Sequence, residues 1–174
     1  MRRTAPGPRP SRDRVRGRVK LSARPPKPTD PQRSALFSRV RQRGTRPELA
    51  VAAALRKLGA AYRLNVRRLP GSPDFANRRR KWAVFVHGCY WHHHTGCRRA
   101  TVPKANEAFW RAKFRDNRAR DAKAIRTLRS QGFRVSIIWE CDVTDEAGLI
   151  AKLSKLVEGS AQRRARPPRS QSPG

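Results

Sequence analysis

The chain has 174 residues and a formal net charge of +30, because 42 Lys and Arg outnumber 12 Asp and Glu. This length suits one domain with its own core and leaves little room for a second. No apolar run approaches the roughly 20 residues of a membrane span, and the basic N-terminus lacks the apolar stretch of a secretory signal. We therefore expect a cytoplasmic protein with no membrane contact.

The positive charge is spread over the whole chain. Residues 1–29 carry ten basic and one acidic side chain, residues 159–174 carry four basic and none acidic, and residues 30–158 carry 28 basic and 11 acidic. Arg predominates, and its planar guanidinium matches phosphate oxygens, so a nucleic acid is the expected partner. A coding bias toward Arg, Ala and Pro is the alternative explanation, mainly for the two ends.

Composition divides the chain into three parts. Residues 1–29 are rich in Pro, Arg and Ser without apolar periodicity, and residues 159–174 have the same character. Such segments bury too little apolar surface to offset the entropy of ordering, so we expect two disordered basic tails. Residues 30–158 are predicted to form the folded domain.

In chain order, the domain is predicted to begin with a helix over about residues 32–43. A second helix follows from Thr45, which forms a capping box with Glu48, and ends at Gly59. Residues 61–66 are predicted to form a strand, residues 69–73 a turn-rich loop and residues 81–86 a strand that is apolar on both alternations.

A long helix is predicted over about residues 106–130, a second doubly buried strand over residues 133–139 and a closing amphipathic helix over residues 143–158. Strands buried on both faces with flanking helices indicate an α/β sandwich with a central sheet.

The long helix carries an inward stripe that is interrupted by polar side chains. Steps of three and four residues join the positions Trp110, Phe114, Asn117, Asp121, Ile125 and Leu128. A carboxylate on such a stripe is costly unless it is paired, so Asp121 is expected to hold the imidazole of His92. Pairing of Asp121 with Arg118 or Arg120 on the surface is the alternative.

All four histidines lie between His87 and His94, directly after the strand predicted at residues 81–86. Cysteines at short spacing in a cytoplasmic protein are more often metal ligands than disulfides. The pattern predicts a closed, structural Zn²⁺ site, with free buried thiols as the alternative. Its ligands would be Cys89, His94, Cys97 and Cys141, the last arriving if residues 133–139 run alongside residues 81–86.

His87 and His92 remain outside this ligand set and bracket it along the chain. Two positioned imidazoles can serve as a base and as an acid or charge stabiliser near neutral pH. The alternative is that one of them is a supporting or solvated histidine. Pro73-Asp74 before a strand matches half of a nuclease pattern in which the Asp binds Mg²⁺. The other half, an acidic residue two before a Lys, is replaced by Phe85-Val86-His87, so the histidines are candidates for the work of that Lys.

Four separated motifs closely resemble the very short patch repair (Vsr) endonucleases in order and spacing. They are Gly71 to Phe75, Phe85 to His92, Val102-Pro103 with Phe109-Trp110, and Ile138 to Cys141. The resemblance implies a type II restriction-endonuclease-like α/β fold. It also implies a nick 5′ to the T of a T·G mismatch that arises from deamination of 5-methylcytosine.

The resemblance also implies roles for individual residues. Asp74 and the backbone carbonyl of Val86 would bind Mg²⁺, His92 with Asp121 would activate water, and His87 would support the scissile phosphate. Glu48 matches an acidic residue that reaches the active site, although a plain helix cap explains it equally well.

Tyr90, Trp91 and Trp110 match aromatic side chains that wedge into the duplex beside the mismatch, where unstacking costs least. Asn117 is grouped with them as a DNA contact. The chain departs from the family pattern with Val86 in place of Thr and Tyr90 in place of Phe. An extra residue before Cys97 leaves His93 as a possible zinc ligand in place of His94.

Two other functions stay open: a zinc-braced DNA-binding module without cleavage, and a related nuclease with another substrate. A lone mismatch has no twofold symmetry, so we expect a monomer that acts on double-stranded DNA and that can also meet repair-protein partners. The preferred flanking sequence depends on base-edge contacts that the sequence does not reveal.

Overall fold

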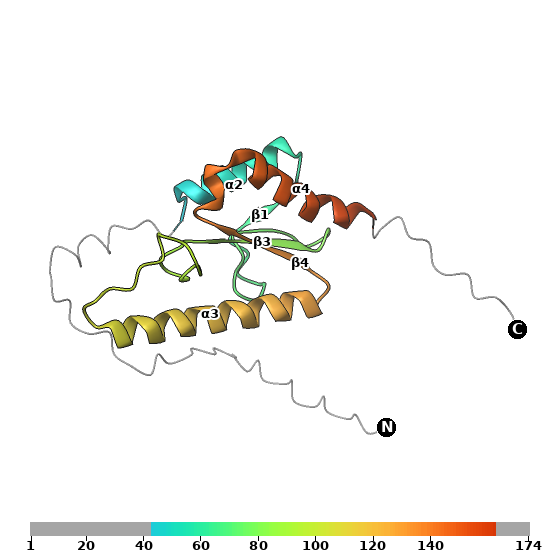
Figure 1. Ribbon diagram of the computed structural model, residues 1–174. Coiled ribbons are helices and arrows are strands. Elements are labelled where there is room, and N and C mark those ends of the chain that lie inside the picture. Colours follow the sequence, from blue (N-terminus) through green and yellow to red (C-terminus); the bar gives the residue numbers. More distant parts are fainter. Residues whose placement is uncertain (1–42, 163–174) are drawn as a thin grey trace, which may run out of the picture.

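The computed structural model describes residues 43–162, which form one sheet with helices on both faces (Figure 1). The helix predicted over residues 32–43 lies almost entirely outside the described residues. The elements, in chain order, are α2 (Arg46–Lys57), β1 (Arg63–Leu64), β2 (Phe75–Asn77), β3 (Trp82–His87), α3 (Glu107–Ser130), β4 (Arg134–Trp139), a 3-10 turn (Asp142–Thr144) and α4 (Glu146–Gln162).

The sheet is mixed, with strand order β1-β2-β3-β4. β1 and β2 pair antiparallel, as do β2 and β3, whereas β3 and β4 run parallel with His87 opposite Trp139. The condition on which the approach of Cys141 depended, that the two apolar strands lie side by side, is therefore met. Because the two strands are parallel, the segments that follow His87 and Trp139 leave the sheet at the same end of the strands.

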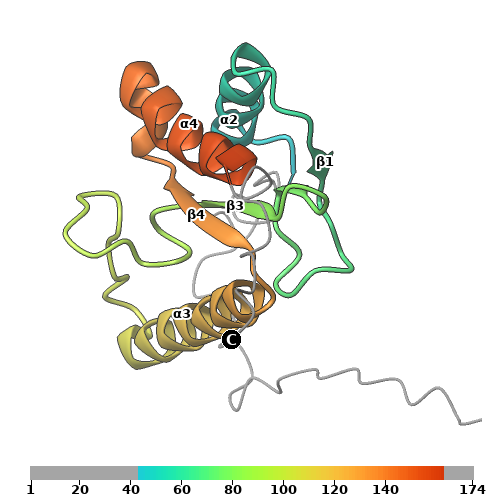
Figure 2. The same ribbon diagram turned by 90° about the vertical axis from the view of Figure 1, so that its right-hand side faces the viewer.

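Helices cover the two faces of the sheet unequally. α2 and α4 lie together on one face and α3 lies alone on the other (Figures 1 and 2). The core on the α2 and α4 side includes Phe75, Trp82 and Leu153, and the core on the α3 side includes Phe85 and Leu128. The predicted α/β architecture of a central sheet with flanking helices is confirmed.

The two apolar strands differ in burial. In β3, five of six residues are buried, as predicted for a strand covered on both faces. In β4, only Ile138 is buried and the other residues are half-buried. The prediction of double burial was wrong for β4, because this strand lies at the edge of the sheet and has a neighbour on one side alone.

Helix α2 begins at the predicted capping box. The Thr45 hydroxyl accepts a hydrogen bond from the Glu48 amide at 3.4 Å and donates one to the Glu48 carboxylate at 2.9 Å. The other carboxylate oxygen accepts from the Gly44 amide at 2.9 Å, one residue before the expected partner. Gly59 follows the helix with φ +59°, a left-handed conformation that suits glycine.

Other boundaries shift from the predictions. The strand predicted at residues 61–66 is limited to β1, because Val66 enters tight turns that continue to Ser72. The closing helix is split into the 3-10 turn and α4, which extends to Gln162. No helix among residues 43–162 is both long and apolar enough to cross a membrane.

Candidate active site

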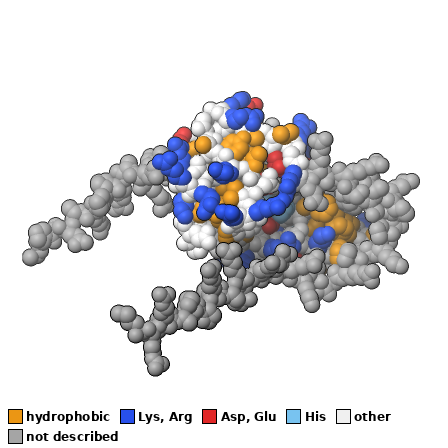
Figure 3. Space-filling view, turned by 180° about the vertical axis from the view of Figure 1, so that it is seen from behind, with side chains coloured by type: hydrophobic (Ala, Val, Ile, Leu, Met, Phe, Trp, Pro, Cys, Tyr) orange, Lys and Arg blue, Asp and Glu red, His pale blue; other side chains and the backbone are white. Residues whose placement is uncertain are grey.

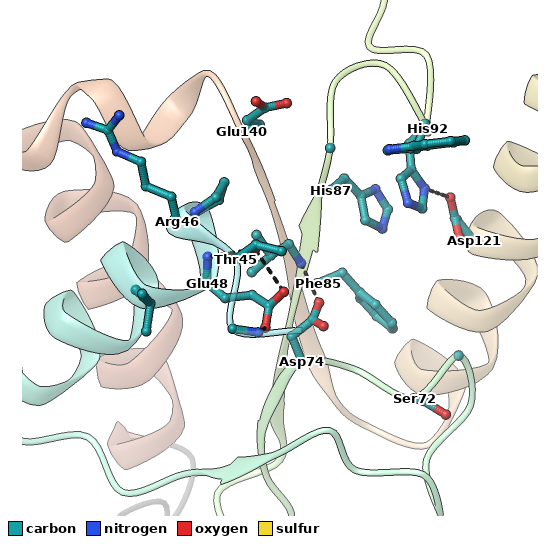
Figure 4. A pocket seen from close by; sticks show the side chains of 17 residues that line it. Thr45, Arg46, Glu48, Ser72, Asp74, Phe85, His87, His92, Asp121 and Glu140 are labelled. Carbon is teal, nitrogen blue, oxygen red and sulfur yellow. Dashed lines mark hydrogen bonds and ion pairs between the residues drawn. The ribbon is translucent and has the colours of Figure 1, made fainter. Parts of the chain in front are cut away.

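A cleft of about 850 Å³ opens where α2 begins, β2 begins and β3 ends. Figure 4 shows Asp74 near its centre, Glu48 from α2 on one side, and His87, His92 and Asp121 on the other. The cleft thus brings together all five residues predicted to be catalytic, from α2, the start of β2, the end of β3, the following loop and α3.

Asp74 is held at the junction of three segments. Its Oδ2 accepts a hydrogen bond from the Val86 amide at 2.7 Å, and its backbone carbonyl accepts from the Asn65 amide at 2.8 Å. Burial raises the pKa of the Asp74 carboxyl above its ordinary value, the Val86 amide opposes this, and the nearby Glu48 carboxylate raises it further. Binding of a cation beside Asp74 would relieve both of the unfavourable effects.

Glu48 contributes both to the helix cap and to the cleft. Both carboxylate oxygens accept hydrogen bonds within the cap, from Gly44 and Thr45. The side chain nevertheless lines the cleft and acts electrostatically on Asp74. The two interpretations of Glu48 are therefore compatible in geometry.

Three side chains opposite Asp74 form a connected group. The Nδ1 atom of His92 lies 2.6 Å from Oδ2 of Asp121, and the rings of His87 and His92 are stacked 3.8 Å apart. His87 is only 5% exposed, and its burial, followed by the charge of His92, lowers its pKa to about 4. The alternative pairing of Asp121 with Arg118 or Arg120 is not what the structure shows: within residues 43–162 the ion-pair partner of Asp121 is His92, and the Arg120 guanidinium donates to Asn117.

A second group of possible metal ligands lies just beyond the cleft. Its members are Cys89, His94, Cys97 and Cys141, whose ligand atoms all lie within 4.8 Å of one another. His94 Nδ1 is 3.3 Å from the Cys141 sulfur and 3.7 Å from the Cys89 sulfur. His93 instead stacks on Phe114 at 4.9 Å, in a left-handed backbone conformation with φ +49°. The parallel pairing of β3 and β4 is what brings Cys141 to the other three residues.

The residues predicted to contact DNA form an aromatic cluster beside the cleft. Tyr90 packs edge-on against Trp91 at 5.1 Å and Trp110 at 5.8 Å. The Lys113 ammonium lies over the Trp91 and Trp110 rings. Asn117 donates to the Trp91 carbonyl at 2.9 Å, so its side chain fixes the loop that carries the aromatic rings.

Two further side chains of the cleft were not predicted from the sequence. Arg46 is the one Lys or Arg among the described residues that line the cleft. Glu140 also lines it and accepts a hydrogen bond from the Cys89 amide at 3.2 Å, which ties the loop after β3 to the end of β4. Two features of the sequence could have pointed to these side chains: Arg46 lies inside the capping box, and Glu140 directly precedes Cys141, a candidate metal ligand.

Comparisons with known proteins show the family to which the chain belongs. The sequence model of the family described as DNA mismatch endonuclease Vsr matches residues 27–99. The chain is 40% identical to the type II nicking enzyme V.XorIIP of Xanthomonas oryzae pv. oryzae over 129 residues, which is 74% of this chain and 94% of the relative.

Two other relatives are similar over comparable lengths. The type II nicking enzyme V.NmeAIP of Neisseria meningitidis is 36% identical over 74% of this chain and 91% of its own length. The DNA mismatch endonuclease Vsr of Escherichia coli is 38% identical over 73% of this chain and 84% of its own length. The chain therefore belongs to the Vsr family of DNA mismatch endonucleases and is a DNA endonuclease.

Proposed function

We propose that the protein nicks one strand of duplex DNA 5′ to the T of a T·G mismatch produced by deamination of 5-methylcytosine, in a Mg²⁺-dependent reaction. The observation that carries this proposal is one cleft that holds Asp74 opposite the His92–Asp121 pair, directly beside the aromatic cluster. The names of the relatives, a mismatch endonuclease and nicking enzymes, support the same activity.

The aromatic cluster supports recognition of a mismatch. Flat side chains inserted between base steps must unstack them, and a mismatched step is cheaper to unstack than a paired one. Trp91 and Trp110 are half-buried rings on a braced loop and at the start of α3, so they combine a fixed position with an accessible edge. Tyr90 packs edge-on against both of these rings. We assign insertion beside the T·G pair to Trp91 and Trp110, with Tyr90 at their base.

The oxygens around Asp74 fit a magnesium ion. Mg²⁺ in nucleases is commonly held by one or two carboxylates together with substrate phosphate oxygens and water. The Asp74 carboxylate and the backbone carbonyl of Val86 would supply the protein ligands, and the raised pKa of Asp74 marks a place where a cation is favoured. A bound Mg²⁺ would neutralise charge on the phosphate and lower the pKa of coordinated water.

His92 is the proposed general base. Asp121 would accept a hydrogen bond from the Nδ1–H group of His92, which fixes the ring and leaves Nε2 as the acceptor for the proton of the attacking water. His87, kept neutral by burial, would donate a hydrogen bond to an oxygen of the scissile phosphate. Glu48, on α2, would act through the electrostatic effect of its carboxylate on Asp74.

The Cys89, His94, Cys97 and Cys141 group fits zinc. Tetrahedral coordination with Zn–S near 2.3 Å and Zn–N near 2.0 Å gives S···N edges of about 3.5 Å, between the 3.3 Å and 3.7 Å separations of His94 from its two cysteines. With four protein ligands the ion would be structural. These residues would then join the loop after β3 to the end of β4, and so hold His87 and His92 in register.

We also propose that residues 30–158 form a restriction-endonuclease-like domain between basic tails, and that the enzyme acts as a monomer. Its substrate, a single mismatch, offers no symmetry for a dimer to match. Contacts with repair proteins would then involve surfaces away from the cleft.

The test is nicking of an end-labelled duplex with one T·G mismatch, beside matched T·A and C·G duplexes, with and without added Mg²⁺. We expect a nick in the T strand of the T·G duplex alone, lost without Mg²⁺ and in the Asp74→Ala variant. Equal cutting of all three duplexes would indicate a general nuclease. Tight binding of the mismatch without any cut would indicate a DNA-binding module.

A further inference from the structure

A strip of arginines follows the first two strands of the sheet. It comprises Arg63 of β1, Arg67 and Arg68 of the turns before β2, and Arg78, Arg79 and Arg80 of the turn after β2, all of them exposed. No carboxylate among residues 43–162 lies within ion-pair distance, 4.0 Å, of any of these guanidiniums. We call this group the arginine strip.

The strip begins at the active site. The Asn65 amide donates to the Asp74 carbonyl, and Arg67 and Arg68 stand in the turns that end at Ser72, which lines the cleft. β2 then runs from the cleft toward the opposite end of β3, because the two strands are antiparallel with Asn77 opposite Trp82. Arg78 to Arg80 follow at that far end.

The strip faces one side of the molecule. β1 lies at the back in Figure 1 and at the right in Figure 2, so the view from behind in Figure 3 looks onto it. Figure 3 shows Lys and Arg side chains gathered on this face, with few acidic ones between them. The aromatic cluster, in contrast, follows the end of β3 at the other end of the strand direction.

The dimensions suit a duplex. Asn77, the last residue of β2, lies three positions after Asp74, which at about 3.3 Å per residue is about 10 Å, or roughly three base pairs of DNA, and the turn that follows carries Arg78 to Arg80. Exposed cations that lack protein partners contribute little to folding and repel one another, whereas a phosphate backbone would neutralise them and release counterions.

We propose that the arginine strip binds the phosphate backbone of the substrate duplex on one flank of the nick, independently of base sequence. The inference rests on the proposed function in so far as the duplex occupies the cleft. DNA then extends from the aromatic cluster across Asp74 and along β2. The strip determines affinity and footprint, and the cleft and aromatic rings determine where the nick is made.

The experiment compares two strip variants, Arg67→Ser/Arg68→Ser and Arg78→Ser/Arg79→Ser/Arg80→Ser, with a control that removes three exposed arginines of α3, Arg115→Ser/Arg126→Ser/Arg129→Ser. Dissociation constants for T·G and matched duplexes are measured against salt concentration without added Mg²⁺. Thermal unfolding of each variant verifies the fold.

The association constant falls as the salt concentration rises. Each strip variant should make the plot of its logarithm against log salt less steep, by up to about one unit of slope for every arginine removed. The loss of affinity should be equal for T·G and matched DNA, because backbone contacts carry no sequence information, and the control should keep the wild-type slope. Duplexes cut short on either side of the mismatch test direction: the strip variants should weaken binding only when the flank over β2 is present.

An unchanged slope in folded strip variants, an equal change in the α3 control, or an equal loss on both truncated duplexes would overturn the inference. Failure of the proposed function would be a separate result: the wild-type protein would bind DNA through the strip but would not nick T·G duplexes.

Discussion

The imidazole rings of His87 and His92 lie face to face, with centroids 3.8 Å apart and planes 7° apart. Within residues 43–162, His92 has a carboxylate partner, Asp121, whereas the buried ring of His87 packs against His92 on one side and forms a T-shaped contact with Trp139. Two positive charges at this separation would repel strongly, and burial already keeps His87 neutral. The pair therefore divides the chemistry: His92, oriented by Asp121, is placed to accept a proton, and His87 stays neutral and has an N–H to donate in a hydrogen bond.

Neutral His87 should make stability depend on pH. Its pKa is about 4 in the folded protein and 6.5 when unfolded, so as pH falls below 6.5 the unfolded chain binds a proton that the folded protein does not. The free energy of unfolding should be independent of this group above pH 6.5. It should fall by up to roughly 3 kcal/mol by pH 4.

Urea unfolding between pH 8 and pH 4.5, without added Mg²⁺, measures this effect in the wild type and in His87→Gln. The difference between the two proteins isolates His87 from acid effects on the other groups. The free energy of unfolding of the wild type, relative to that of His87→Gln, should decrease as the pH falls. Two curves that stay parallel over the whole range would show that His87 does not carry the proton linkage.

Removing the partner of His92 should slow the reaction without weakening binding. In Asp121→Asn, the ring loses the acceptor that orients it, and kcat should fall by about 10²- to 10⁴-fold. The dissociation constant for T·G duplexes should change far less than kcat, since Asp121 pairs with His92 and is not one of the aromatic rings assigned to the mismatch. Asp116→Asn, on the same helix and facing Arg115, is the matched control. A loss of binding equal to the loss of kcat would contradict the assignment.

Sequence periodicity was enough to predict the position of Asp121, because α3 is long and its inward stripe is regular. The approach of Cys141 to Cys89 was expected only on the condition that the two apolar strands lie side by side, and the parallel pairing of β3 with β4 meets this condition. Local patterns did not decide between His93 and His94. That choice depends on the left-handed backbone at His93 and on the stacking of its ring against Phe114, a residue 21 positions away.

The cysteine group should bind one zinc ion per chain. Cys89→Ser removes one ligand. This variant should no longer bind zinc stoichiometrically, and its free energy of unfolding should be lower than that of the wild type by more than about 3 kcal/mol. Nicking should be lost as well, because the loop after β3 carries His92. His93→Gln is the control, since His93 lies outside the ligand group. Zinc analysis, urea unfolding and nicking are the measurements, and a fully stable, zinc-free Cys89→Ser protein would argue against a structural metal.

Arg46 should contribute to binding of the scissile strand. It is the one cationic side chain among the described residues of a cleft that also contains Glu48, Asp74, Asp121 and Glu140. Loss of a charge-assisted contact with phosphate in Arg46→Ala should raise KM about tenfold, with kcat little changed. Arg56→Ala, in the last turn of the same helix, is the control. An unchanged KM would place Arg46 outside the substrate path.

Gly71, in the loop that precedes Asp74, packs closely against α3. It has φ +73°, and a Cβ there would lie 2.6 Å from Cβ of Ala124 and 3.1 Å from the ring of Phe85. Gly71→Ala should therefore cost about 1–2 kcal/mol for the left-handed conformation and a further 1–3 kcal/mol for the collision. Gly59→Ala separates the two effects, since Gly59 has φ +59° and open space around it.

Urea unfolding of Gly71→Ala, of Ala124→Gly and of the two combined completes a double-mutant cycle, with Gly59→Ala measured beside it; the Ala124→Gly variant accounts for the cost of a glycine inside α3. The second substitution removes the colliding methyl group and should restore part of the loss, leaving the conformational cost that Gly59→Ala also shows. Because residue 71 stands three positions before Asp74, kcat should fall in Gly71→Ala and recover in the double variant. Equal losses in Gly71→Ala and Gly59→Ala would mean that the loop moves away from α3 freely, and that its packing does not hold Asp74 in place.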